Sequence, residues 1–405
     1  MNLILYAIPG FFFLIALELI AEKVRGTNYY QASDAITSLN LGVLSRMSGI
    51  LQAFVPFALY AAVYDSVSLF EMPNHWAIWV LAFVLYDFTY YWVHRFGHEM
   101  NVMWAAHVVH HSSEEYNLTT ALRQTSTSFL SVLFYIPMAV LGFDPLMLLT
   151  VGSLNLIYQF WVHTRHIGKL GWYELFFVTP SNHRVHHAQN DIYIDKNYGG
   201  FFILWDRLFN TFQEELDEQP VVFGITGAIS SWNPFWANIQ VYKQLWVDAS
   251  LTNNWWHKVT IWFRRTGWRP PDVEARFPTR KAALSEFKKF NVVIPNSIKV
   301  YGVVHYIVLA ALVLTFLVNI TSMTSLSVLG CTVFIAFSTY AIGVVLENLS
   351  HATIIEWVRV PALIVAMLVL PVPLWLTAVV VSMSAFSFLL LVIGRREMLS
   401  APAIS

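Results

Sequence analysis

The sequence predicts an all-α fold: a multi-pass membrane helical bundle with a cytoplasmic histidine-rich di-metal site. Of the 405 residues, 57% are hydrophobic and only 12% are charged, whereas soluble proteins carry about 25% charged residues. Several apolar stretches approach the roughly 20 residues that a helix needs to cross a bilayer. Many of the 14 histidines are gathered in dense groups where such stretches end.

Nine stretches are predicted to span the membrane. Two of them form a helical hairpin, because Gly142, Asp144 and Pro145 interrupt the apolar run between them. The first stretch lacks a basic start and a small-residue cleavage site, so it is expected to be a retained helix and not a signal peptide. The nine stretches are 3–20, 44–63, 76–93, 127–142, 144–163, 300–320, 326–347, 359–374 and 376–394.

The spans and the polar region between them divide the chain into four predicted parts. Residues 1–75 hold the N-terminal membrane helices, and residues 76–215 hold the histidine-rich region. Residues 216–299 form a cytoplasmic or interfacial amphipathic region, and residues 300–405 form a C-terminal membrane helical module. Because the last module contains few ionisable residues, we expect it to serve packing or oligomerisation.

Positive charge is distributed unevenly along the chain. If the amino terminus faces outward, all 24 Lys and Arg residues fall on the cytoplasmic side, and the outer loops, including 64–74, have none. Lys and Arg concentrate on the cytoplasmic side of membrane proteins. The histidines are therefore expected on that side, in a multi-pass protein. The net charge of −1 gives no indication of a nucleic-acid partner.

The polar region contains two Trp-rich segments, residues 236–248 and residues 254–263, the second followed by Arg264 and Arg265. Trp on one side of a helix with basic residues nearby is typical of helices that lie in the headgroup plane. Such helices would form a cap that lets a lipid enter from the bilayer. The alternative is ordinary core packing of a cytosolic domain. Residues 277–295 resemble an ordinary soluble helix.

Eight histidines lie in three groups with helical spacing, which places the imidazoles of each group on one helix face. Without a metal, many buried nitrogens would lack partners, at a cost of about 1–3 kcal/mol for each unsatisfied group. The groups, with His163 as a ninth candidate, predict a two-metal site. They are His94 and His98; His107, His110 and His111; and His183, His186 and His187.

Other polar residues near the groups have weaker roles. His166 is a tenth candidate but is more typical of a surface histidine. Asp87 lies two helical turns before His94, and a carboxylate inside a membrane is costly unless it is paired. It is predicted to orient an imidazole. Further candidates for that role, or for capping and ion pairing, are Glu99, Glu114, Asp191, Asp195 and Asp206. Isolated histidines expected to serve packing are His75, His257, His305 and His351.

The donor set limits the metal. One cysteine, Cys331, excludes a disulfide framework and a thiolate site. Imidazole suits iron, zinc, copper and nickel. Two iron ions are favoured because they can activate O2 to attack an unactivated C–H bond, whereas zinc is redox-inert. The alternatives from another class are a haem-binding or zinc-binding membrane protein without oxygenase turnover.

Three further motifs surround the histidines: YQFWVHT at 158–164, TPSNHRVHHAQN at 179–190 and DKNYGGFFILWDRLFNTF at 195–212. With the histidine triplets they resemble the fatty acid hydroxylase and sterol desaturase superfamily, over about residues 80–215. The resemblance implies a membrane di-iron monooxygenase whose catalytic domain is residues 76–215. It also implies iron ligation by His94, His98, His107, His110, His111, His163, His183, His186 and His187.

Within this superfamily the motifs are most similar to the branch that cleaves glycerol ether lipids. That likeness implies a membrane lipid substrate, O2, and tetrahydrobiopterin as electron donor, with an aldehyde and glycerol as products. Related members instead take electrons from a redox protein such as cytochrome b5 or a ferredoxin. Hydroxylation or desaturation of a sterol or fatty acid is the alternative within the superfamily.

Overall fold

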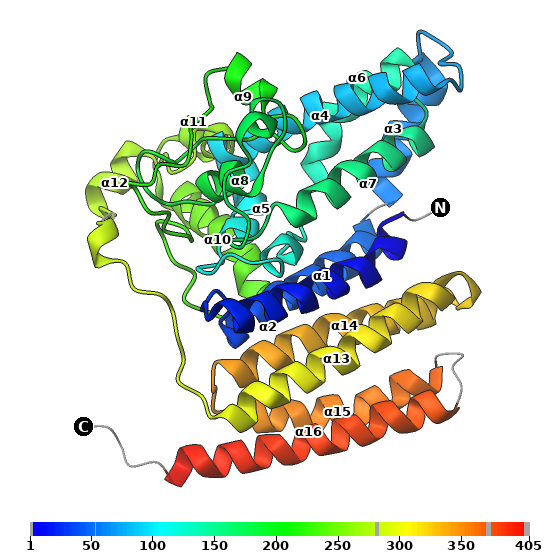
Figure 1. Cartoon of the computed structure of the whole chain (residues 1–405), viewed down its shortest axis with the longest axis vertical. Helices are drawn as coiled ribbons and strands as arrows, with labels where there is room; N and C mark the ends of the chain where they lie inside the picture. Colours follow the sequence, from blue (N-terminus) through cyan, green and yellow to red (C-terminus); the bar gives the residue numbers. More distant parts are fainter. Residues whose placement is uncertain (1–2, 53, 280–282, 370–373, 401–405) are drawn as a thin grey trace. The chain divides into compact units, whose positions relative to one another are not determined.

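The computed structural model describes residues 3–52, 54–279, 283–369 and 374–400 (Figure 1). These residues form helices and loops, with no strand among them beyond two isolated bridges. The predicted all-α class is therefore confirmed. The α-helices are α1 (Leu3–Arg25), α2 (Ala32–Gln52), α3 (Phe54–Val67), α4 (Trp76–Glu99), α5 (Asn101–His111), α6 (Val132–Leu141), α7 (Pro145–Trp161), α8 (Pro180–His186), α9 (Leu204–Leu208), α10 (Pro234–Leu251), α11 (Trp255–Thr260), α12 (Pro271–Arg276), α13 (Asn296–Asn319), α14 (Ser325–Leu346), α15 (Ala352–Val369) and α16 (Leu374–Ser400).

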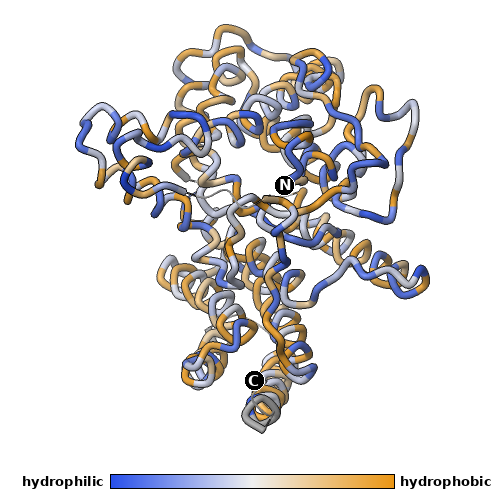
Figure 2. Tube along the Cα trace, turned by 90° about the vertical axis from the view of Figure 1, so that its left-hand side faces the viewer, coloured by the Kyte–Doolittle hydropathy of each residue, from blue (hydrophilic) through white to orange (hydrophobic). Residues whose placement is uncertain are grey.

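Five helices in the described ranges are long and apolar enough to cross a membrane: α1, α4, α13 with its short extension, α14 and α16. Figure 2 colours the chain by hydropathy and shows hydrophobic residues along its long helices. A sixth span results if α2 and α3, which are bent by 48°, count as one. The chain is an integral multi-pass membrane protein. The prediction of nine spans was too high: the two hairpin arms fold as the shorter helices α6 and α7, and α15, which holds most of the predicted span 359–374, is not among the five or six in the described ranges. At 1.5 Å per residue, the 10 residues of α6 reach only about half of the bilayer core.

Two other predicted elements differ from the structure or lie outside it. Residues 370–373 of the predicted span 359–374 are outside the described residues. In the described part of residues 277–295, a short 3-10 turn, Leu284–Glu286, replaces the predicted helix. Most side chains of this segment are exposed, and a helix gains most of its stability from packing an apolar face.

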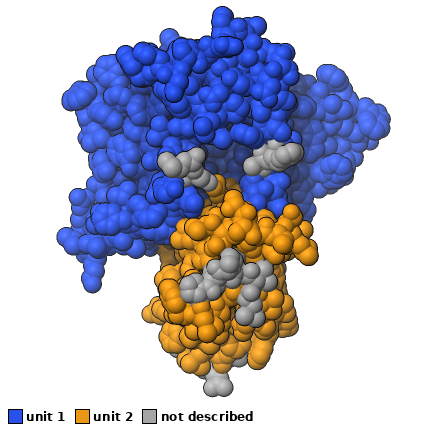
Figure 3. All heavy atoms as spheres, turned by 90° about the vertical axis from the view of Figure 1, so that its right-hand side faces the viewer, with its two compact units in different colours: residues 1–30, 49–229, 238–288 blue, residues 31–48, 230–237, 289–405 orange. Residues whose placement is uncertain are grey.

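The chain forms two compact units (Figure 3). Unit 1 consists of Met1–Tyr30, Gly49–Ile229 and Asn238–Lys288, and it contains all nine predicted ligand histidines. Unit 2 consists of Gln31–Ser48, Ser230–Ala237 and Lys289–Ser405. In unit 2, α13 packs against α14 and α16, and α15 packs against α14 and α16. The fully buried Arg359 is neutralised there by Glu356, whose Oε2 accepts from Nη2 at 2.7 Å.

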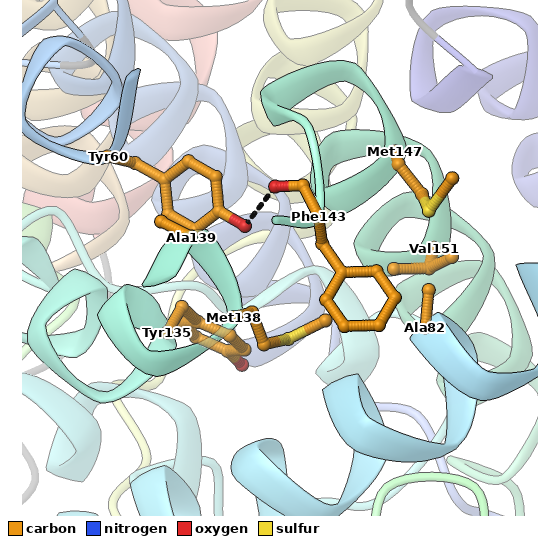
Figure 4. Packing of buried hydrophobic residues seen from close by; sticks show 8 residues of the cluster. All are labelled: Tyr60, Ala82, Tyr135, Met138, Ala139, Phe143, Met147 and Val151. Carbon is orange, nitrogen blue, oxygen red and sulfur yellow. Dashed lines mark hydrogen bonds between the residues drawn. The ribbon is translucent and has the colours of Figure 1, made fainter. Parts of the chain in front are cut away.

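In unit 1, helices α3, α4, α6 and α7 meet in one apolar cluster (Figure 4). Tyr60 of α3 donates its hydroxyl proton to the carbonyl of Phe143 at 2.8 Å. The predicted break between α6 and α7 is observed: α6 ends at Gly142, whose φ is +97°. Asp144 then caps α7 by accepting from the backbone N–H groups of Leu146 and Met147. This hairpin packs against α4 and so supports the helix that leads to the histidines.

Replacing Gly142 by alanine is expected to destabilise this hairpin. An added Cβ would lie 1.9 Å from the carbonyl oxygen of Phe70, and a left-handed backbone costs a non-glycine residue about 1–2 kcal/mol even without a clash. Thermal unfolding in detergent should therefore occur at a clearly lower temperature. Gly49→Ala is the matched control, because its Cβ would meet nothing within 4 Å and the residue is helical, in the last turn of α2. It should be neutral or stabilising, and equal losses in both variants would contradict this interpretation.

Candidate metal centre

Two consecutive helices bring the first two histidine groups together. α4 ends at Glu99, Met100 is extended with φ −126° and ψ 127°, and α5 starts at Asn101. This corner folds α5 back along the end of α4. As a result, the Nε2 atom of His94 lies 2.9 Å from that of His107. In the same way, the Nε2 atoms of His98 and His111 are 3.1 Å apart.

The third histidine group is carried by the short helix α8 and the residue after it. A capping box starts this helix: the Thr179 hydroxyl accepts from the backbone N–H of Asn182, and the Asn182 side chain accepts from that of Thr179. This cap is needed because a helix of seven residues is too short to be stable alone. His163 follows α7, and its Nε2 atom lies 3.0 Å from that of His183.

All nine predicted histidines gather in two groups of imidazoles, and in each group the candidate ligand atoms lie within 4.8 Å of one another. The first group is His94, His98, His107, His111 and His186. The second group is His110, His163, His183 and His187. Each sequence triplet is thus split between the two groups. His166 belongs to neither group, and its ring lies against Tyr29 with centroids 5.1 Å apart.

Backbone carbonyls determine the tautomer of four of these imidazoles. A carbonyl oxygen only accepts, so each Nδ1 must carry the proton and each Nε2 presents a lone pair. These pairs are His94 with Tyr198 at 2.7 Å, His110 with Arg123 at 3.0 Å, His163 with Gln159 at 2.8 Å and His186 with Lys196 at 2.9 Å.

The lone pairs are directed toward one another inside each group. The Nε2 atoms of His110 and His163 are 3.3 Å apart, and neither has a proton to share. The Nε2 atom of His186 is buried without a hydrogen-bond partner. Facing lone pairs repel unless a cation lies between them, so the residues present fit a metal ion in each group.

Burial lowers the pKa of the histidines of α5 and α8 and so keeps these imidazoles uncharged at neutral pH. It lowers the pKa of His107, His111 and His183 well below the usual value for histidine, and neighbouring imidazoles lower it further. For His110, burial lowers the pKa to about 4. A metal binds the neutral form of imidazole. At neutral pH, the five histidines of α5 and α8 are therefore ready to bind a metal.

Asp87 does not have the predicted role of orienting an imidazole. Its carboxylate accepts from the backbone N–H groups of Phe201 at 2.8 Å and Phe202 at 3.0 Å, and from the side chains of Trp205 and Asn155. It therefore holds the loop after the third histidine group against α4 and α7. This loop contains the carbonyl of Tyr198 that orients His94, so Asp87 acts on the site only indirectly.

Two more carboxylates hold the loops around the site. Asp206 accepts from the backbone N–H groups of Tyr198 and Gly199 at 2.7 Å each, and burial raises its pKa to about 6. Glu18 of α1 accepts from the backbone N–H of Leu118 at 2.8 Å and from the hydroxyls of Tyr30 and Thr164. The sequence reasoning missed Glu18, although a carboxylate in an apolar stretch was a signal.

A pocket opens beside the first histidine group. It is lined by α4, α5 and residues 125–131, and His94 and His107 form part of its wall. Tyr90 also lines it and donates its hydroxyl proton to the side chain of Gln159 at 2.8 Å. Most of the lining is apolar. A hydrocarbon chain could therefore reach the first group through this pocket.

Fold and site together define a class: a multi-pass membrane protein with a buried, histidine-rich centre suited to two metal ions and bordered by an apolar pocket. A family model described as fatty acid hydroxylase matches residues 79–211. The chain is 34% identical to the alkylglycerol monooxygenase of Homo sapiens, over 87% of this chain and 80% of that protein. It is 35% identical to the alkylglycerol monooxygenase of Xenopus tropicalis, over 86% of this chain and 78% of that one.

A more distant relative is the ornithine lipid hydroxylase OlsE of Rhizobium tropici, which is 29% identical over 48% of this chain and 61% of its own. No solved structure matches the chain. The chain belongs to the fatty acid hydroxylase family, as its motifs predicted, and it is an O2-dependent monooxygenase or hydroxylase.

Asp87→Ala is expected to destabilise unit 1. Four donors would lose their acceptor, at about 1–3 kcal/mol for each buried group left unsatisfied. Thermal unfolding in detergent should show that the free energy of unfolding falls by several kcal/mol, because the loop that carries Tyr198 is released. Asp65→Ala removes an exposed carboxylate and should change stability by no more than about 0.5 kcal/mol. A wild-type unfolding temperature for Asp87→Ala would show that this carboxylate does not hold the loop.

Proposed function

We propose that the nine histidines bind two iron ions, one in each group. The observation that carries this proposal is the set of inward lone pairs, with four imidazoles oriented by Nδ1–H bonds to backbone carbonyls. Iron is favoured over zinc because the family reaction consumes O2, which requires a redox-active metal. The ligands are His94, His98, His107, His111 and His186 for one ion, and His110, His163, His183 and His187 for the other.

The proposed substrate is an alkylglycerol, a lipid with an ether-linked alkyl chain. This choice is supported by relatives of that name, of which the chain covers about four fifths. With iron bound, the centre supplies the oxidising power to insert one atom of O2 into a C–H bond. Two electrons and two protons reduce the other atom to water. The hydroxylated ether carbon is a hemiacetal, which breaks its C–O bond to give an aldehyde and glycerol.

The chain's own residues orient the substrate and keep the site dry. The apolar pocket beside His94 and His107 would hold the alkyl chain, with the ether carbon at the first histidine group. Excluding water from the site protects the oxidant from side reactions. Tetrahydrobiopterin is the proposed electron donor, and a redox protein is the alternative donor. An alternative substrate is a sterol or fatty acid.

The site is proposed to lie on the cytoplasmic side. Residues 68–75, which join α3 to α4, have no Lys or Arg, whereas α1 ends with Lys23 and Arg25. Lys and Arg favour the cytoplasmic side, so the end of α4 that carries the histidines would face the cytoplasm. The proposed parts are 1–75 for the N-terminal helices, 76–215 for catalysis, 216–299 for an interfacial region and 300–405 for a C-terminal module.

His110→Ala is expected to abolish turnover while the protein still inserts into the membrane. It removes one of four nitrogens from the second group, so the iron content should fall from two ions toward one per chain. Metal analysis of the purified protein and a lipid product assay measure the two effects. His257→Ala is the control, since that imidazole lies outside both groups, and it should keep both iron and activity. Full activity of His110→Ala would refute the ligand assignment.

The substrate is tested with the purified protein in vesicles. Incubation with an alkylglycerol, O2 and tetrahydrobiopterin should yield a fatty aldehyde and glycerol, and omitting the pterin should stop the reaction. Sterols and free fatty acids are the comparison substrates under the same conditions. A hydroxylated sterol or fatty acid with no aldehyde from the alkylglycerol would replace the proposed substrate. Activity with reduced cytochrome b5 alone would replace the proposed donor.

A further inference from the structure

The segment formed by α11 and the following 3-10 turn η4 (Ile261–Phe263) exposes four large apolar side chains. Trp255 is 78% exposed, Trp256 66%, Val259 57% and Phe263 65%. With about 100° per residue in α11 and about 120° in the 3-10 turn, these positions fall on one side of the segment, in a stripe about 140° wide. Ile261, on the other side, is completely buried against Ala105 of α5. The segment is therefore anchored through one face and presents an apolar face outward.

Backbone hydrogen bonds fix this segment at the end of a membrane span. The N–H of Asn101 donates to the carbonyl of Arg264 at 2.9 Å, and the N–H of Thr266 donates to that of Glu99 at 3.2 Å. The Asn101 side chain also donates to the carbonyl of Ile261. α4 has 24 residues, about 36 Å of helix, which exceeds a bilayer core of about 30 Å. Its last residue, Glu99, therefore lies at the level where the span meets the headgroups.

Three positively charged residues lie next to the apolar stripe. Lys258 donates to the carbonyls of Ala249 and Ser250 at the end of α10, and its ammonium lies 5.6 Å from the ring of Trp255. Arg264 and Arg265 follow the turn and are exposed. Trp is enriched at both membrane interfaces, and basic side chains attract anionic headgroups. This combination fits a lipid surface better than a neutral protein partner.

The same region is connected to the pocket. Asn238 of α10 accepts from the N–H of Ser126 at 2.8 Å, and Tyr242 of α10 donates to the hydroxyl of Thr127 at 3.2 Å. Residues 125–131 line the pocket. The α4 residues in its wall, Tyr90 to Gly97, lie about 3–14 Å along the helix from Glu99. The pocket thus extends from near the headgroups through most of the depth of one leaflet, which is about 15 Å.

We propose that Trp255, Trp256, Val259 and Phe263 dock into the headgroup layer of an anionic bilayer. This docking keeps the pocket at the depth from which a lipid can enter with its polar end still in the interface. The second statement rests on the proposed function. The first does not, because it depends only on the exposed stripe and its bonds to the end of α4.

Spin-label accessibility tests the depth without using activity. Cys331 is the single cysteine of the chain and is buried, so Cys331→Ala provides a background for one label at Val259→Cys. In vesicles that contain phosphatidylserine, this label should collide more with O2 than with a water-soluble nickel chelate. A label at Glu218→Cys, in an exposed polar turn, should show the reverse. A Val259 label that is open to the nickel chelate, or shielded from both reagents by a protein interface, would overturn the proposal.

A second measurement tests the link to the pocket. The variant Trp255→Ala, Trp256→Ala, Phe263→Ala should raise KM severalfold for a long-chain alkylglycerol in vesicles. It should leave kcat unchanged for a short-chain alkylglycerol dispersed in detergent. Equal effects on both substrates would indicate a merely structural role and would overturn the link. If the Val259 label is buried in the bilayer but the protein turns over no alkylglycerol, the proposed substrate would be refuted and the proposed docking surface would still be supported.

Discussion

The site depends on one interaction: the bond from a histidine Nδ1–H to a backbone carbonyl. An imidazole has two nitrogens and one proton when neutral, so fixing the proton on Nδ1 leaves Nε2 as a lone-pair donor. Four of the nine histidines have this bond. Each accepting carbonyl belongs to a segment that must itself be held still. Much of the structure around the histidines consists of hydrogen bonds that fix those segments in place.

Buried carboxylates accept several of these hydrogen bonds. Irregular loops near a membrane cannot rely on water to satisfy their N–H groups. Asp206 accepts from the N–H of Tyr198, the residue whose carbonyl orients His94. Asp87 of α4 accepts from the N–H of Phe201 in the same loop. Glu18 of α1 accepts from the N–H of Leu118 and from the hydroxyl of Thr164, the residue after His163. Carboxylates within apolar helices are costly, so their presence at these points reflects the demands of the loops.

The imidazoles must also be uncharged in order to bind a metal. Burial, together with repulsion between neighbouring imidazoles, lowers the pKa of His111 and His187 well below that of a free histidine, so both are uncharged at neutral pH. A cluster of neutral nitrogens with facing lone pairs is unfavourable by itself. A divalent cation in each group removes that repulsion and competes with no proton at neutral pH. The membership of the chain in an O2-consuming family is consistent with a redox-active cation there.

The sequence by itself determined the helical class, the membrane insertion, the family and all nine histidines that gather in the site, because hydropathy and spacings of three and four residues are local properties. It did not determine how the nine divide. His110 belongs to a different group from His107 and His111 of the same helix. This division follows from tertiary contacts, because the ring of His110 packs against those of His163 and His187. The partners of Asp87 and Glu18 were also decided by tertiary structure, since Phe201 and Leu118 lie 114 and 100 residues away. The span count failed for a related reason: hydropathy records that a segment is apolar, but only the fold shows that α6 packs against α3 and is too short to cross.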